Sequence, residues 1–110
     1  MDLPSSVDLQ KLREAVSSGR FEWRKHVLQR LASRGIPQSH VVDVLMKGEK
    51  IRDYSDDKPF PSAVFLGWID TRPIHVVVAF DPKSNWGYII SAYEPDLEHF
   101  KPDFKTRRPS

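Results

Sequence analysis

Hydrophobic positions recur with a helical period through the first half of the chain and predict three helices. A glycine, which favours helix termination, directly follows each of them. Pro37 and Ser39 suit the start of the third helix. The predicted helices run from a cap within Ser5–Asp8 to about Ser18, from about Phe21 to Arg34, and from about Pro37 to Lys47.

After Gly48 the period changes to two, which predicts strands. Short connections at 70–72 and 81–85 make their neighbours antiparallel. The chain from Pro95 on is expected to be irregular, with a short extra strand near Phe100. Helices followed by strands indicate an α+β fold with helices on one face of an antiparallel sheet. The four predicted strands are Lys50–Tyr54, Ala63–Asp70, Pro73–Phe80 and Trp86–Tyr93.

The length of 110 residues suits a single domain over residues 1–110. Within it, residues 1–20 are expected to form an N-terminal helical extension and residues 95–110 an irregular basic tail. The chain has no Cys, which excludes disulfides and thiol catalysis. Together with the lack of a basic-then-apolar segment at Met1–Ser6, this favours a cytoplasmic location. No apolar run approaches the roughly 20 residues of a membrane span.

Three basic side chains recur every fourth residue in the second predicted helix and form one row along it: His26, Arg30 and Arg34. This basic row borders the apolar stripe, where a residue of a cleft would lie. A His that moves a proton and two cations that hold a phosphate are the groups that metal-independent RNA cleavage needs. The alternative is a set of solvated surface cations.

Two polar side chains in the predicted sheet are further candidates. His75 lies in an otherwise apolar strand, and we interpret it as a proton donor or, alternatively, as a hydrogen-bonded packing residue. Tyr93 lies in the next strand and shares a face with His75 if the register allows. Strict alternation places Tyr88 on the face opposite Tyr93.

The net charge of +2 and the pI of about 9.0 are weak evidence for nucleic-acid binding. Arg107 and Arg108 are either a frayed cationic end or a phosphate-binding pair. The four His residues are scattered, and the chain has no His-Glu-x-x-His motif and no phosphate-binding glycine loop. We therefore predict neither a metal nor another cofactor.

Taken together, the spaced motifs resemble an uncharacterised bacterial family of domains of unknown function over about residues 24 to 108. That family is similar to the RelE/BrnT-like toxins, which are small α+β proteins. The motifs are His26-x3-Arg30-x3-Arg34-Gly35-Ile36, Arg72-Pro73-Ile74-His75-Val76-Val77, Tyr93-x-Pro95-Asp96 and Arg107-Arg108.

The resemblance implies two or three N-terminal helices on a curved antiparallel sheet of about four strands. It also implies a metal-independent ribonuclease, the toxin of a toxin–antitoxin pair whose antitoxin carries a YgiT-type zinc finger. The residues that the resemblance places in the catalytic site are His26, Arg30, His75, Tyr93 and Arg107.

In that site, either His75 or His26 would act as the base or the acid, and Arg30 and Arg107 would stabilise charge on the phosphate. Tyr93 would stack on a base or donate a hydrogen bond. Further RNA contacts are expected from Arg34, Lys105 and Arg108.

Two other functions stay open. The first is a toxin-fold module without catalysis that binds RNA or a protein partner. The second is an interaction domain for an acidic partner segment, in which Trp68 and Trp86 would be interface anchors.

Overall fold

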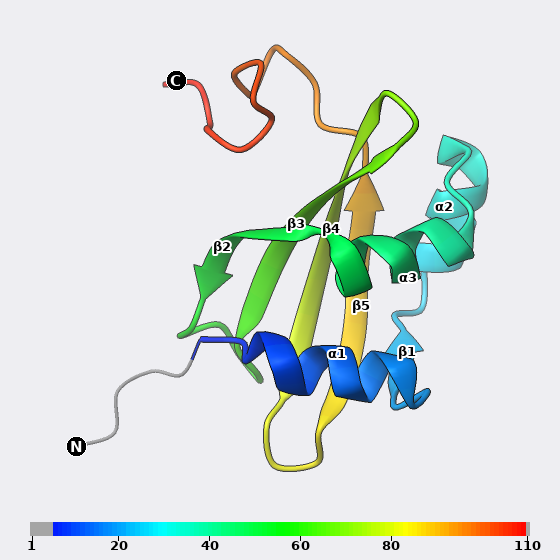
Figure 1. The fold of residues 1–110 in the computed structure, drawn as a ribbon, viewed down its shortest axis with the longest axis vertical. Helices are drawn as coiled ribbons and strands as arrows, with labels where there is room; N and C mark the ends of the chain where they lie inside the picture. The colour runs from blue at the N-terminus through cyan, green and yellow to red at the C-terminus, as the bar shows by residue number, and fades with distance from the viewer. Residues whose placement is uncertain (1–5, 110) are drawn as a thin grey trace.

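The computed structural model describes residues 6–109, which form three helices and one five-stranded sheet (Figure 1). Ser5, expected in the first helix cap, lies outside them, and Asp8 caps the helix by accepting a hydrogen bond from the Lys11 amide. No helix within residues 6–109 is long and apolar enough to cross a membrane. The elements are α1 (Leu9–Ser17), β1 (Phe21–Trp23), α2 (Val27–Arg34), α3 (Gln38–Lys47), β2 (Glu49–Tyr54), β3 (Ser62–Ile69), β4 (Arg72–Asp81) and β5 (Trp86–Tyr93).

The sheet has the strand order β1-β5-β4-β3-β2. The antiparallel pairing of β2, β3, β4 and β5 confirms the four predicted strands, whose bounds agree closely. The prediction of about four strands is nevertheless one short, because β1 adds a fifth strand that runs parallel to β5.

The prediction of a helix from Phe21 is wrong for residues 21–26. Phe21 and Trp23 instead belong to β1, and their rings pack edge to face with centroids 6.0 Å apart. The Gly87 amide donates to the Arg20 carbonyl, and the Arg24 amide donates to the Ile89 carbonyl. These bonds to β5, with partial burial of two aromatic rings, outweigh the weak helical preference of this segment.

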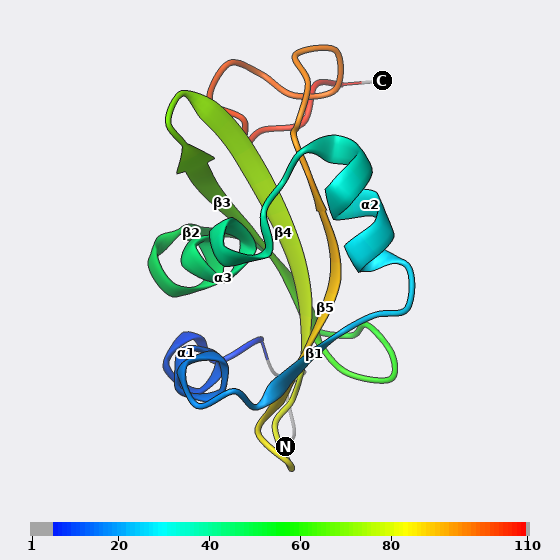
Figure 2. The same ribbon diagram turned by 90° about the vertical axis from the view of Figure 1, so that its right-hand side faces the viewer.

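The helices and one face of the sheet enclose the core. Figure 2 shows α1 and α3 on one side of the sheet, and α2 lies beside β5. Val7, Leu12 and Ala15 are buried in this core together with Phe65 and Val76. The described part of the first twenty residues therefore contributes side chains to the core.

Two β-bulges set which side chains lie on the opposite face of the sheet, called here the open face. One extra residue, Ile51, interrupts β2, and another, Ile90, interrupts β5. Because of the second bulge, Tyr88 pairs with Ala79, and its side chain lies on the same face as those of Tyr93 and its partner His75. The expected sharing of a face by His75 and Tyr93 is confirmed, whereas the placement of Tyr88 opposite Tyr93 is wrong.

The chain after β5, called here the tail (residues 95–109), folds back over one end of the open face (Figures 1 and 2). Within residues 95–109 the extra strand expected near Phe100 is reduced to a single bridge between Phe100 and Arg107. Asp103 stabilises one turn of the tail by accepting hydrogen bonds from Lys105 and Thr106. These bonds lower the pKa of Asp103 to about 2.

Candidate functional site

A small cavity of about 140 Å³ lies on the open face, between the sheet and the tail. Strands β2, β4 and β5 and the tail all contribute polar side chains to it. Of the five residues predicted to be catalytic, it contains His75, Tyr93 and Arg107. Its lining residues are Ile51, Arg52, Tyr54, Val64, His75, Val77, Tyr93, Phe100 and Arg107.

His75 is completely buried beneath the tail, and both of its ring nitrogens have partners. The Phe104 carbonyl oxygen lies 2.6 Å from Nε2, and because a carbonyl only accepts, Nε2 carries the proton. Nδ1 of the neutral ring then accepts from the Tyr93 hydroxyl at 3.3 Å. Phe104 adopts φ 57°, a left-handed conformation uncommon for an aromatic residue. The tail thus fixes one tautomer of His75 through a backbone carbonyl.

Burial lowers the pKa of His75, and the nearby charges of Arg52 and Arg107 lower it further, against the raising effect of the bond to Phe104. Burial likewise raises the pKa of Tyr93, against the opposing effect of Arg107. The His75 imidazole and the Tyr93 hydroxyl are therefore both uncharged at neutral pH. The charged side chains that line the cavity with them are the cations Arg52 and Arg107.

The two guanidinium groups of the cavity have no carboxylate partner within residues 6–109. Arg52 donates a long hydrogen bond of 3.4 Å to the Lys105 carbonyl, and Arg107 lies 6.0 Å from the centre of the Phe100 ring. Tyr54, from the same strand as Arg52, is 40% exposed. Two unneutralised cations beside neutral hydroxyl and imidazole groups form a site that attracts an anion.

The basic row predicted in the second helix is not part of this cavity. His26 precedes α2 as an exposed residue without a side-chain capping bond, and Arg30 is exposed on α2. Arg34 donates to the Ala92 carbonyl at 2.7 Å and so ties the end of α2 to β5. Neither His26, Arg30 nor Arg34 lines the cavity with His75.

The two tail cations predicted to bind RNA have local partners. Arg108 donates to the carbonyls of Leu97 and Phe100, which holds the tail in its loop. Lys105 forms an ion pair with Glu49 at 2.9 Å, and the hydrogen bond to Glu49 raises its pKa. Both side chains are exposed and can still approach a ligand, but each has a structural role.

Arg52 and Tyr54 are cavity residues that the sequence analysis missed. In a regular strand, Lys50, Arg52 and Tyr54 would share one face. The bulge at Ile51 instead separates Lys50, which pairs with the core residue Phe65, from Arg52, which pairs with Val64. The charge at residue 52 was a visible signal, but its face depends on a bulge that alternation does not reveal.

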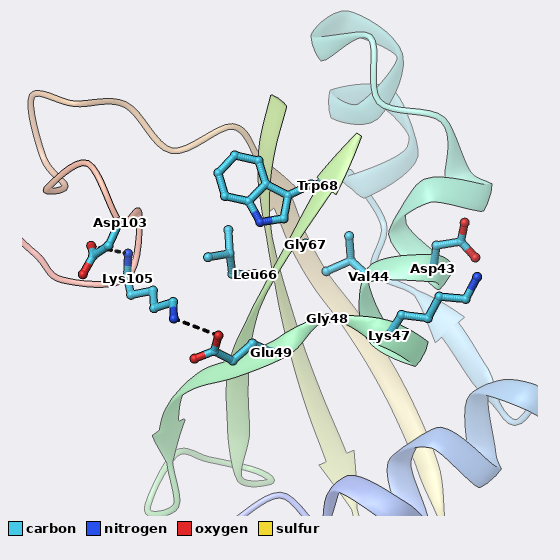
Figure 3. Close-up of a pocket in the computed structure, with 10 residues that line it drawn as sticks. All are labelled: Asp43, Val44, Lys47, Gly48, Glu49, Leu66, Gly67, Trp68, Asp103 and Lys105. Carbon is cyan, nitrogen blue, oxygen red and sulfur yellow. Dashed lines mark hydrogen bonds and ion pairs between the residues drawn. The ribbon is translucent and has the colours of Figure 1, made fainter. Parts of the chain in front are cut away.

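A larger cavity of about 810 Å³ lies between the end of α3, β3 and the tail (Figure 3). The exposed Trp68 meets Phe104 edge to face at its rim, and the Lys105–Glu49 pair crosses it. Acidic and basic groups alternate along its wall, and no titratable group there is buried. It therefore lacks the convergent polar chemistry of the smaller cavity.

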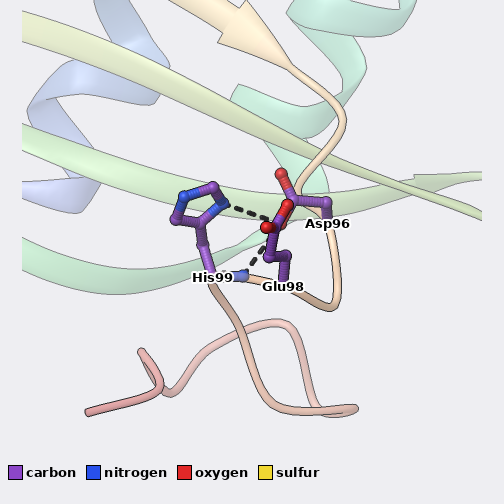
Figure 4. Close-up of side chains that lie close together, drawn as sticks. All are labelled: Asp96, Glu98 and His99. Carbon is purple, nitrogen blue, oxygen red and sulfur yellow. Dashed lines mark hydrogen bonds and ion pairs between the residues drawn. The ribbon is translucent and has the colours of Figure 1, made fainter. Parts of the chain in front are cut away.

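Asp96, Glu98 and His99 are the group within residues 6–109 whose ligand atoms lie close enough to hold a metal, within 4.8 Å of one another (Figure 4). All three are exposed. Asp96 accepts hydrogen bonds of 2.8 Å from both the amide and Nδ1 of His99. These hydrogen bonds explain why Asp96 and His99 lie close together without a bound ion.

Comparison with known proteins gives one relationship. No curated protein and no solved structure matches the chain. The family model described as "Domain of unknown function (DUF4258)" matches residues 23–94, which run from the last residue of β1 through β5 and leave out α1 and the tail. Arg52, Tyr54, His75 and Tyr93 lie within the match, and Arg107 lies beyond it. The chain belongs to the DUF4258 family.

Proposed function

We propose that this protein binds RNA and that Arg52 and Arg107 hold a phosphate of the RNA backbone. The observation that carries the proposal is the pair of guanidinium groups without carboxylate partners in one polar cavity. Guanidinium groups match phosphate oxygens in a bidentate geometry. In this proposal the hydroxyl of Tyr54, a residue that is 40% exposed, contacts the ribose or a phosphate oxygen.

In this proposal His75 is a positioning residue. It is completely buried, so it does not reach a ligand outside the tail. Its Nδ1 instead accepts from the Tyr93 hydroxyl and orients it. The neutral state of His75 also avoids a third positive charge next to Arg52 and Arg107 in the absence of a ligand.

The proposal is tested by measuring RNA affinity as a function of salt concentration for the wild type, Arg107→Gln and Arg108→Gln. Loss of one phosphate contact weakens binding for every RNA sequence and reduces the salt slope by about 1. We expect this change for Arg107→Gln. Arg108→Gln is the matched control, because Arg108 is the neighbouring arginine and is bound to tail carbonyls. Equal affinities and slopes for the two variants would contradict the proposal.

A second candidate function, metal-independent cleavage of the bound RNA, is favoured by the hydrogen-bonded chain Tyr93–His75–Phe104 beside the guanidinium groups. In this candidate, Tyr93 takes the proton of a ribose 2′-hydroxyl while it passes its own proton to Nδ1 of His75. The 2′-oxygen attacks phosphorus, a 2′,3′-cyclic phosphate forms, and the 5′-oxygen leaves with a proton from water. The hydroxide that remains takes the proton back from His75 through Tyr93, so both side chains return to their neutral forms. Arg52 and Arg107 stabilise the charge that develops on the phosphate.

Cleavage is tested by incubating RNA with the purified protein in the presence of EDTA. Under this candidate, Tyr93→Phe lowers the rate by about 100-fold or more, the usual contribution of a proton-transfer group. RNA that is bound but not cut would leave the non-catalytic module as the function.

A toxin–antitoxin role is the cellular form of this proposal, and its support is the resemblance to RelE/BrnT-like toxins. It predicts that overexpression arrests growth and that a zinc-finger antitoxin co-purifies with the chain. Arg107→Gln should relieve the arrest while the protein stays folded and expressed. Growth arrest that persists in this variant would separate the toxic effect from the cavity.

A further inference from the structure

The open face carries a second group of side chains at the end away from the tail. The Phe60 and Tyr88 rings stack there with centroids 5.5 Å apart and an angle of only 7° between their planes. The Arg24 guanidinium lies 4.7 Å from the centre of the Tyr88 ring. We call these three residues the aromatic cluster. They come from the β2–β3 loop, from β5 and from the residue after β1, so tertiary structure brings them together.

The aromatic cluster remains accessible. Arg24 is exposed, and Phe60 and Tyr88 are partly exposed, although Tyr88 pairs across the strands with a buried residue, Ala79. Arg24 has no carboxylate partner within residues 6–109. A planar π surface combined with an unneutralised guanidinium is the combination on which unpaired nucleobases stack.

The aromatic cluster and the Arg52–Arg107 cavity lie along the same strands. The bulge at Ile90 places Tyr88 and Tyr93 on one face of the sheet. On that face Tyr88 pairs with Ala79 of β4, and Tyr93 pairs with His75. Those two β4 residues are four positions apart, which is about 13 Å along a strand. A nucleic-acid strand that follows β5 can therefore reach both places.

The charges on the open face favour this route along β5. The acidic residues Asp56 and Asp57 line a shallow hollow next to Tyr54, on the β2 side. Asp57 is engaged there by the Ser62 hydroxyl at 2.7 Å. On the β5 side, the cations Arg24 and Arg107 stand at the two ends of the path. The Glu22 carboxylate, which lies beside Tyr88 in the register of β1 and β5, accepts a hydrogen bond from Trp86 Nε1.

We infer that the aromatic cluster is a base-stacking subsite and that the RNA bound by this protein is single-stranded. The inference rests on the proposed function, since it names the substrate class of the same surface. A base in a duplex has both faces covered by its neighbours, whereas an unpaired base can stack on Phe60 or on the side of the Arg24 guanidinium that faces away from Tyr88. The stacking contact is tolerant of sequence because every base has a π face.

The test uses the full chain and three fluorescently labelled probes. They are an unpaired RNA of about eight nucleotides, a duplex of the same length, and a ribose–phosphate oligomer of that length without bases. We expect the single strand to bind about tenfold or more tightly than the oligomer without bases. A 2-aminopurine base in the single strand should lose fluorescence when it stacks.

Two variants connect this difference to the aromatic cluster. Phe60→Leu keeps an apolar side chain and the net charge but removes the flat ring, and it should weaken single-strand binding about tenfold and abolish the 2-aminopurine signal. Arg24→Gln should do the same more strongly than Lys25→Gln, which removes an equal charge at the next residue. Phe60→Leu should leave binding of the oligomer without bases unchanged, whereas Arg107→Gln should weaken it.

The outcomes separate the two proposals. Binding that depends on Arg107 but is equal for the single strand and the oligomer without bases overturns the stacking subsite and leaves the phosphate site intact. Preference for the duplex, or an unchanged 2-aminopurine signal in Phe60→Leu, also overturns it. Absence of binding to all three probes overturns the proposed function and this inference with it.

Discussion

At the scale of single residues, His75 links the cavity to the stability of the protein. Its pKa is lowered from 6.5 by burial in the folded state, so the unfolded chain binds more protons as the pH falls below that value. The free energy of unfolding should therefore decrease as the pH falls from 6.5 toward the folded-state pKa. Above pH 6.5 both states are neutral at this residue, and it adds no pH dependence.

This dependence is measured by urea unfolding at several pH values between 5 and 8. The carboxylates with lowered pKa, such as Asp103, act below this window and do not interfere. We expect the His75→Gln variant to have a flatter profile than the wild type. His26→Gln, which changes an exposed His, should keep the wild-type profile. A wild-type profile in His75→Gln would show that another group is responsible.

The Tyr93 hydroxyl has a more local effect. Tyr93→Phe removes the donor to His75 Nδ1 and leaves that buried acceptor without a partner. We expect a loss of about 1 kcal/mol in the free energy of unfolding, as for a typical buried hydrogen bond. Tyr54→Phe is the matched control, because Tyr54 is exposed and its hydroxyl has no hydrogen bond within residues 6–109. Comparable losses in both variants would contradict the assignment.

At the scale of elements, close contact between α3 and β3 depends on a missing side chain. A Cβ at Gly67 would lie 2.6 Å from Val44 Cγ2. Gly67→Ala should therefore push α3 away from the sheet and cost about 1–3 kcal/mol of stability, measured by thermal or urea unfolding. Gly87→Ala on β5 is the control, since its Cβ would meet its nearest neighbours at 3.5 Å, an ordinary contact distance, and should cost little.

The elements also show what the sequence could predict. Period-two patterns gave the four antiparallel strands, because one face of each strand is buried against the helices. β1 was not predicted, because the residues of β5 with which it pairs lie more than 60 positions further along the chain. His75, Tyr93 and Arg107 were predicted as site residues, whereas Arg52 and Tyr54 needed the bulge at Ile51. His26 and Arg30 were predicted as members of one helical row, but α2 begins only at Val27, after His26.

At the scale of the whole molecule, the tail covers a site whose other walls belong to the family domain. The family match ends at residue 94, and the side chains that close the cavity over His75 lie in residues 95–109. The main core cluster, from Val7 to Ala92, contains no tail residue, and the buried Phe100 of the tail packs instead against His75 on the open face. A chain that ends after Glu94 should therefore remain folded.

In that shortened chain, His75 loses the cover of Phe100 and Phe104 and the charge of Arg107. Since burial is the main cause of the lowered pKa, we expect the pKa of His75 to rise toward 6.5. An NMR titration of the imidazole resonances in both chains measures this change. An unchanged pKa would mean that the sheet alone buries His75, and loss of folding would assign the tail a structural role.

The bulges at Ile51 and Ile90 have a consequence for how this surface can change in evolution. Each bulge is a single residue of chain length that reverses which side chains the rest of its strand presents. Deleting Ile90 would remove the bulge and leave Tyr88 and Tyr93 four positions apart in a regular strand, on the same face, whereas straightening β5 at its present length would place them on opposite faces. The open face can therefore survive the loss of this one codon, but not a change of register that removes the bulge while Ile90 is retained.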